Sequence, residues 1–93
     1  NHEGKIIDEM HRSIDSCEGI IINPGAFTHY SYAIRDAIES VEIPTAEVHL
    51  SDINNREDFR KKSVIKDVCI GQISGLGKVG YLNAVKMIID YKN

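Results

Sequence analysis

Residues 19–25 read Gly-Ile-Ile-Ile-Asn-Pro-Gly, a continuous apolar run that follows a glycine and stops at a Pro-Gly turn. A short run of isoleucines with these boundaries is typical of a β-strand that is buried on both faces, as in a parallel sheet. Asn23 is the first polar residue after the run. We therefore predict a buried strand over residues 19–23, with a turn at Pro24 and Gly25.

Amphipathic helices are predicted on both sides of this strand. The helix before it covers roughly residues 4–17, and the helix after it has Thr28 or Ser31 as a possible cap and Pro44 just beyond its end. The apolar stripe of the first helix is Ile6, Ile7, Met10, Ile14 and Cys17. The stripe of the second is Ala33, Ile34, Ala37, Ile38 and Val41.

The rest of the chain continues the alternation. We predict a strand over residues 45–50 (TAEVHL), a short charged helix around Arg56 to Arg60, a strand over residues 68–73 (VCIGQI), and a last helix after residues 75–77. The apolar positions expected for that helix are Val79, Leu82, Val85, Met87 and Ile89. Strands alternating with helices indicate an α/β domain with a parallel sheet.

We interpret residues 1–93 as a single incomplete α/β domain. The chain begins at Asn1 without a methionine and enters a helix at once. An additional strand-helix-strand unit upstream would complete a five-stranded, flavodoxin-like, three-layer arrangement. We therefore expect the longer parent protein to contain sequence before Asn1.

Composition excludes several classes of partner. The net charge is −3, the pI is about 5.7, and no basic cluster exceeds the pair Lys61-Lys62. Nucleic acid is therefore not expected as a partner, because phosphate binding needs concentrated positive charge. No apolar run approaches the roughly 20 residues of a membrane helix. Cys17 and Cys69 lack further ligands at zinc-binding spacing, so we expect two buried thiols in a cytoplasmic protein and no metal site.

Polar or small residues replace the apolar run at the end of each predicted strand, where open parallel sheets bind ligands. His49 ends the second strand, and Glu47 precedes it by two residues, so both lie on one strand face. A carboxylate beside an imidazole fixes the tautomer of the ring and suits a general acid. His49 is therefore a candidate catalytic or ligand-contacting group, with a satisfied structural histidine as the alternative.

The loop from Asn23 to His29 offers further polar groups at the same edge. Asn23 and His29 could contact a ligand, or Thr28 could cap the helix and His29 could be exposed. Arg60 could bind an anionic ligand or lie in solvent. Leu50 and Ser51 lie where a helix is about to begin, so their backbone N–H groups could hold a carboxylate.

Residues 75–80, Gly-Leu-Gly-Lys-Val-Gly, match the G-x-G-x-x-G pattern after a predicted strand. The pattern favours an alternative function, a non-catalytic module that binds a nucleotide or phosphate at the Gly75–Gly80 turn. However, no second strand and no ribose-binding acid follow at the spacing that a dinucleotide site needs. We interpret the glycines as a tight strand-to-helix turn.

Several motifs together resemble type II 3-dehydroquinate dehydratase. They occur in order along the chain: NHEG (1–4), NPGAFTH (23–29), IRDA (34–37), EVHLS (47–51), REDFR (56–60) and GLG (75–77). Phe27, Tyr30 and Asp52 depart from the residues most usual in that family. The resemblance implies a flavodoxin-like fold and a cofactor-free anti elimination of water from 3-dehydroquinate, which yields 3-dehydroshikimate in the shikimate pathway.

The resemblance also implies roles for individual residues. His49 is the proton donor to the leaving hydroxyl and Glu47 its orienter. Asn23, His29 and Arg60 bind substrate hydroxyls, and the backbone of Leu50 and Ser51 holds the substrate carboxylate. Asp36 reaches into a neighbouring subunit, since the family forms trimers that assemble into dodecamers.

The base is the missing part of this pattern. The family's catalytic Tyr, with its helper Arg, precedes the matched region, and none of the four tyrosines here matches it: Tyr30, Tyr32, Tyr81 and Tyr91. We expect the 93 residues alone to be inactive as a dehydratase. A subunit with only an assembly role is a third interpretation.

Overall fold

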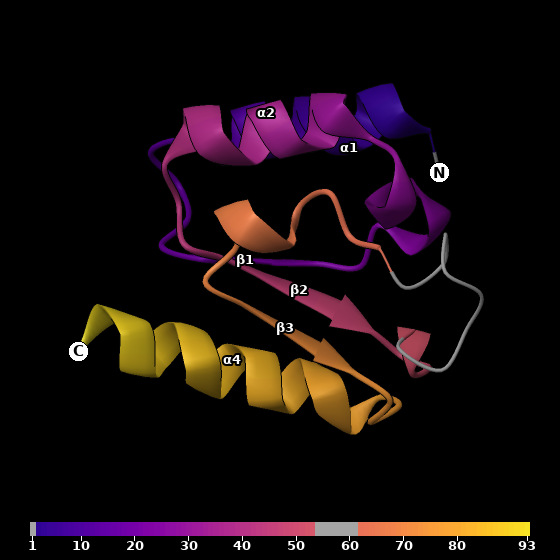
Figure 1. Ribbon diagram of the computed structural model, residues 1–93. Helices are drawn as coiled ribbons and strands as arrows, with labels where there is room; N and C mark the ends of the chain where they lie inside the picture. The colour runs from indigo at the N-terminus through magenta and orange to yellow at the C-terminus, as the bar shows by residue number, and fades with distance from the viewer. Residues whose placement is uncertain (1, 54–61) are drawn as a thin grey trace.

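The computed structural model describes residues 2–53 and 62–93, which form three layers (Figure 1). Helices α1 (Glu3–Arg12) and α2 (Tyr32–Val41) cover one face of a sheet, and helix α4 (Val79–Lys92) covers the other. The strands are β1 (Ile20–Ile22), β2 (Thr45–His49) and β3 (Gly71–Ser74). Two short 3-10 helices, η1 (Gly25–His29) and η3 (Lys66–Val68), complete the described elements. The predicted short helix at 56–60 lies outside the described residues.

The sheet is parallel with strand order β1-β2-β3, which confirms the predicted α/β architecture. In this register Glu47 of β2 lies between Ile22 of β1 and Gln72 of β3. All five residues of the central strand are buried. Because the strands are parallel, their carboxyl ends meet at one edge, where the segments after Ile22, His49 and Ser74 come together.

Each face of the sheet has its own apolar core. Towards α1 and α2, the buried cluster is Met10, Ile22, Ile34, Ala37, Ile38, Val41, Val64 and Ile65. Towards α4, it is Ala46, Val48 and Ala84, with Ile21, Ile70, Ile73, Met87 and Ile88 packed against them. Ile21 and Ile22, neighbours in β1, therefore enter opposite cores, as the alternation of side chains along a strand requires.

Two predicted elements have different limits in the structure. Helix α1 ends at Arg12 rather than near Cys17, because Ser13 and Ser16 donate side-chain hydrogen bonds to helix carbonyls and Asp15 adopts a left-handed φ of 72°. Cys17 is consequently exposed, so its predicted burial is wrong. The third strand begins at Gly71 rather than residue 68, because Lys66–Val68 form η3.

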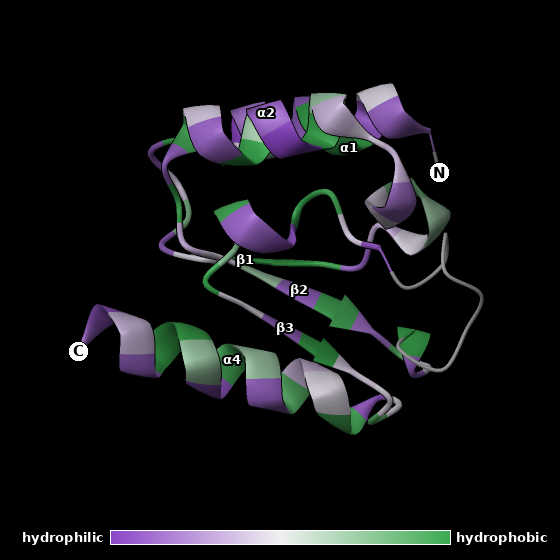
Figure 2. Cartoon of the chain, in the orientation of Figure 1, coloured by the Kyte–Doolittle hydropathy of each residue, from purple (hydrophilic) through white to green (hydrophobic). Residues whose placement is uncertain are grey.

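The predicted contact face of α4 is wrong except at Met87, which packs against the core. Gly80 and Ala84 are buried against the sheet, and a Cβ atom added to Gly80 would lie 3.4 Å from both Val48 and Ile73. Small residues thus allow the helix axis to approach the strands closely. Four of the expected core residues are exposed instead: Val79, Leu82, Val85 and Ile89. Figure 2 shows hydrophobic residues along much of the length of α4. Within residues 2–53 and 62–93, no helix is long and apolar enough to cross a membrane.

Ser31 caps helix α2. Its Oγ accepts a hydrogen bond from the backbone N–H of Ile34 at 3.0 Å and donates one to Oε2 of Glu3, at the start of α1. The cap therefore also links the two helices that cover this face of the sheet. Of the two predicted cap residues, Ser31 has this role and Thr28 does not.

Replacing Ser31 with Ala should lower the free energy of unfolding by about 1–2 kcal/mol, because the buried N–H of Ile34 and the Glu3 carboxylate lose a partner. Urea denaturation followed by circular dichroism measures this change. Ser40→Ala is the control, since its hydroxyl donates to the Ala37 carbonyl within its own helix. Equal stability of the two variants would contradict the capping role.

Candidate active site

Glu47 and His49 form a buried pair on the central strand. The two residues are separated by one position in β2 and therefore point to the same face of the sheet. Oε2 of Glu47 lies 2.5 Å from Nε2 of His49, and the side chains are 0% and 6% exposed respectively. The predicted pairing of carboxylate and imidazole is confirmed.

Two hydroxyl groups complete the surroundings of the Glu47 carboxylate. Thr28 of η1 donates its Oγ1–H to Oε2, and Oγ of Ser63 lies 3.0 Å from Oε1 and 2.9 Å from Oε2. Sequence patterns did not identify either residue for this position. Thr28 was a candidate helix cap, and Ser63 has no local signal, because its contact with Glu47 spans 16 residues of sequence.

The charge of Glu47 is stabilised despite its position. Burial alone would raise the pKa of this carboxyl, but hydrogen bonds from His49, Thr28 and Ser63 outweigh burial and hold the pKa below its ordinary value. Gln72, opposite Glu47 in the register, acts in the same direction, although its buried Nε2 makes no hydrogen bond of normal geometry. A lowered pKa of Glu47 stabilises the folded protein. This stabilisation is present above the ordinary pKa of glutamate and is lost as the pH falls through the lower pKa of Glu47 in the folded state.

The pairing determines which nitrogen of His49 can act on a ligand. Because Glu47 accepts a hydrogen bond from Nε2–H, the second nitrogen, Nδ1, is the one that can exchange a proton with another group. A fixed imidazole backed by a buried carboxylate is an arrangement suited to general acid catalysis.

Asn23 lies at the same edge of the sheet, immediately after the register partner of Glu47. Its Oδ1 accepts a hydrogen bond from the Gly25 N–H at 3.2 Å, and its Nδ2 donates to the Tyr81 hydroxyl at 3.1 Å. Gly25 has a φ of 60°, which permits this tight turn. Both ends of the amide are thus oriented, and the side chain keeps further donor and acceptor capacity.

His29 anchors the segment that follows residue 61. Its Nδ1 lies 2.7 Å from the carbonyl oxygen of Lys62, so Nδ1 carries the proton and Nε2 is the acceptor nitrogen of the neutral ring. The neighbouring Val64 is bound in the same way, through its N–H to the Thr28 carbonyl and through its own carbonyl to Arg35. These contacts place Ser63 beside Glu47.

The remaining predicted site residues lie elsewhere or outside the described ranges. Leu50 and Ser51 follow β2 and are exposed at its carboxyl end. Asp36 is exposed on α2, and among the described residues it is not one of the hydrogen-bond partners of Glu47 or His49. Arg60 lies outside the described residues.

The Gly75–Gly77 turn holds the end of the central strand. The Gly75 N–H bonds to the His49 carbonyl at 3.3 Å, and the Gly77 N–H bonds to the Leu50 carbonyl at 3.0 Å. A glycine-rich phosphate site needs such N–H groups for its ligand. Because these two are used within the fold, and Asp52 lies against Gly75, the turn is unsuited to a phosphate. The geometry thus disfavours the nucleotide-binding alternative.

Cys69 does not supply a nucleophile near this site. Burial, together with the charge of Glu47, raises the pKa of its thiol to about 12. The residue therefore stays a neutral thiol at physiological pH.

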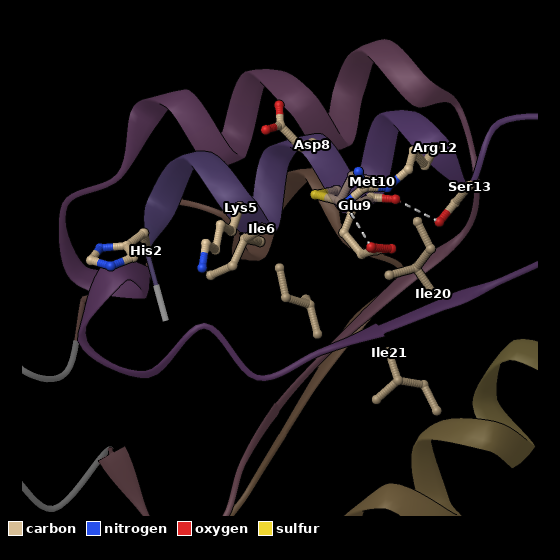
Figure 3. Close-up of a pocket in the computed structure, with 11 residues that line it drawn as sticks. His2, Lys5, Ile6, Asp8, Glu9, Met10, Arg12, Ser13, Ile20 and Ile21 are labelled. Atoms are coloured by element: carbon tan, nitrogen blue, oxygen red, sulfur yellow. Dashed lines mark hydrogen bonds and ion pairs between the residues drawn. The ribbon is translucent and has the colours of Figure 1, made fainter.

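A hollow of about 610 Å³ lies between α1 and β1 (Figure 3). Its apolar lining includes Ile6 and Ile20, whereas Lys5, Glu9 and Arg12 bring charges to it. Neither Glu47 nor His49 lines this hollow. Its charged residues come from the solvent-facing part of one helix, and Glu9 and Arg12 pair with each other. The Glu47–His49 pair is therefore the stronger candidate for acid–base chemistry.

Comparison with known proteins identifies relatives along almost the whole chain. Residues 1–89 match the family model described as dehydroquinase class II. The chain is 61% identical over 88 residues to a 3-dehydroquinate dehydratase of Thermotoga maritima, covering 95% of this chain and 60% of that protein. It is 59% identical over 90 residues to one of Bacillus mycoides, covering 97% and 62%. The chain thus spans about three-fifths of these relatives' length.

A solved structure shows the same arrangement. The crystal structure of a type II dehydroquinase from Butyrivibrio crossotus matches with a TM-score of 0.92 and 54% identity, over 96% of this chain and 63% of that chain. A type II dehydroquinase from Propionibacterium acnes matches with a TM-score of 0.87 and 37% identity, over 97% and 63%. These likenesses confirm the predicted flavodoxin-like α/β fold.

The Gly75 turn yields a test of how the end of β2 is held. Gly75→Ala should lower the free energy of unfolding by about 1–2 kcal/mol, because its φ is +80° and the new Cβ would lie 3.1 Å from the Cβ of Asp52. Gly4→Ala in α1 is the control, since nothing lies within 4 Å of its Cβ position. Chemical denaturation compares the two variants. A Gly75 variant as stable as the Gly4 variant would show that the turn is not needed.

Proposed function

This chain belongs to the class II dehydroquinase family, and we propose that it supplies the proton donor of a 3-dehydroquinate dehydratase. The reaction would be the elimination of water from 3-dehydroquinate to give 3-dehydroshikimate, the dehydration step of the shikimate pathway. The observation that carries the proposal is the buried Glu47–His49 pair, at the carboxyl end of the central parallel strand. Ligands of open α/β sheets bind at this edge.

The pair suits the difficult part of the elimination. A hydroxyl leaves poorly as hydroxide, so the carbon–oxygen bond breaks more readily when a positioned acid delivers a proton to the oxygen. His49 would donate that proton from Nδ1 as the bond breaks, and water would leave. Glu47 would retain its charge and hold Nε2–H throughout. The ring would then return to its neutral form and regain a proton from solvent.

The other half of the reaction is removal of a proton from the carbon beside the ketone. The family pattern assigns this step to a Tyr with a helper Arg, and we assign it to none of these 93 residues. The negative charge that develops on the substrate would need hydrogen-bond donors in fixed positions. The oriented amide of Asn23 is a group of this kind at the correct edge of the sheet.

Substrate binding would use groups around the carboxyl ends of β1 and β2. We propose that Asn23 and His29 bind substrate hydroxyls, since each has one end fixed by the protein and capacity left at the other. The backbone of Leu50 and Ser51 would hold the substrate carboxylate. A hydroxyl-binding role for Arg60 is supported by its match to the family motif.

Assembly would complete the site. Asp36 is exposed on α2, and in the family pattern the matching residue reaches a neighbouring subunit's site. We therefore propose that the longer protein forms the family's oligomer, trimers assembled into a dodecamer, and that Asp36 acts across an interface within it. Exposure of a carboxylate on the outer side of α2 is compatible with such a role.

His49→Ala should reduce kcat by at least about 10²–10⁴-fold, the usual contribution of a general acid, while the protein stays folded. The assay is the ultraviolet absorbance of the conjugated enone product, with a polypeptide of the relatives' full length that carries this sequence. His11→Ala, an exposed histidine of α1, is the control and should retain the parent rate. A His49 variant with near-parent kcat would remove His49 from the mechanism. A folded parent that never forms the enone would refute the proposed function.

Mixing subunits tests the role of Asp36. Separately, Asp36→Ala and His49→Ala oligomers should both be nearly inactive. After dissociation and reassembly together, a fraction of sites would combine an intact Asp36 from one subunit with an intact His49 from another, and activity should return. Each variant reassembled alone is the control. Hybrids that stay as inactive as the controls would show that Asp36 does not act across the interface.

A further inference from the structure

We propose that Thr28 and Ser63 are positioning residues that fix the Glu47 carboxylate and thereby aim the proton of His49. This inference rests on the proposed function, because it assigns a role to groups that act through His49. Within the part of the chain that the structure describes, both hydroxyls hydrogen-bond to the carboxylate behind His49 and not to the imidazole.

The donors around Glu47 account for both of its oxygens. Oε2 accepts from Thr28 Oγ1 and from His49 Nε2, and Ser63 Oγ lies 3.0 Å from Oε1. A carboxylate with no exposed surface is costly unless donors of this kind surround it. Each hydroxyl carries only one proton, and Thr28 Oγ1 and Ser63 Oγ also lie 3.0 Å apart. The anionic oxygens of Glu47 are stronger acceptors for these protons than a neighbouring neutral hydroxyl. The third donor that remains is Nε2–H of His49.

The two hydroxyls are themselves fixed from several elements. Thr28 is fully buried in η1, and its carbonyl accepts the Val64 N–H at 2.8 Å. Ser63 Oγ accepts the N–H of Lys66 at 3.1 Å, so one of its two lone pairs is occupied while its proton faces Glu47. Arg35 of α2 holds the next carbonyl, that of Val64, at 2.8 Å. Groups from η1, α2 and the start of η3 therefore determine the direction of both O–H bonds.

Glu47 and His49 compete for the proton on Nε2, and the two hydroxyls influence which of them holds it. With the hydroxyls present, the carboxylate is satisfied as an anion and accepts a hydrogen bond from Nε2–H without taking the proton. Without them, it would become more basic and could rotate, so that the ring could exchange its tautomer or turn. The Nδ1 proton would then no longer point at the leaving hydroxyl, and kcat would fall while substrate binding stayed the same.

The test uses paired substitutions in the full-length enzyme. Thr28→Val removes the hydroxyl with almost no change in shape, Ser63→Ala removes the other, and Thr28→Ser restores a hydroxyl at the first position. Ser40→Ala is the matched control, because its hydroxyl donates to a carbonyl of its own helix. We expect Thr28→Val and Ser63→Ala each to lower kcat by about tenfold or more, with KM within about twofold of the parent. Thr28→Ser and Ser40→Ala should keep close to the parent kcat.

A second measurement reports directly which nitrogen of the His49 ring carries the proton. Nitrogen-15 NMR of His49 should show the neutral ring of the parent as the Nε2–H tautomer, and a mixture of tautomers in the Thr28→Val/Ser63→Ala double variant. This readout needs a folded protein and no turnover. It therefore decides the positioning role even if the parent proves inactive, an outcome that would end the proposed function alone.

Two results would overturn the inference. One is a double variant that keeps both the parent kcat and a pure Nε2–H tautomer. The other is a loss of kcat that Thr28→Ser fails to prevent, since it would come from packing and not from the hydroxyl. If Thr28→Val does not fold, Ser63→Ala alone carries both measurements, because Ser63 is only partly buried.

Discussion

The Glu47 carboxylate is the group around which this structure is organised. It has no exposed surface and lies in the central strand of a parallel sheet, where neighbouring strands flank it on both sides. An ionised group in such a place persists only when the protein supplies the hydrogen bonds that water would have made. Donors from η1, from the segment before η3 and from the same strand meet this requirement. The same contacts bring distant parts of the chain to the end of β2.

The two faces of the sheet have different roles in holding His49. Glu47 and His49 point towards the side covered by α1 and α2, where the polar network is surrounded by a large apolar core. The opposite face packs closely on α4 through Gly80 and Ala84. Close packing there and the Gly75–Gly77 turn hold the backbone of His49 and Leu50 from behind. The imidazole is therefore attached to a rigid strand, which favours a defined direction for proton transfer.

The geometry of the Glu47–His49 pair depends on hydrogen bonds, on contacts between remote segments and on the sheet. The charge on Glu47 needs its donors, the donors need the folded contacts between η1 and residues 62–64, and those contacts need the parallel sheet to bring the strand ends together. The proposed chemistry, delivery of a proton to a leaving hydroxyl, needs only one well-directed N–H bond. Under the proposed mechanism, the hydrogen bonds around Glu47 would fix that direction, since a misdirected acid contributes little to the rate.

Local sequence was sufficient for the order of the elements, the parallel sheet and the shared face of Glu47 and His49, because each follows from spacing over a few residues. It left the cap of α2 open between Thr28 and Ser31, and the structure assigns that role to Ser31. It was insufficient where partners are remote. The start of β3, the contact face of α4 and the roles of Thr28 and Ser63 depend on what lies opposite each residue. Apolar periodicity marks which residues can be buried, but small residues such as Gly80 and Ala84 become a contact face only when a strand lies against them. In the same way, a hydroxyl becomes a positioning group only when folding brings it to a carboxylate, as happens for Ser63 across 16 residues of chain.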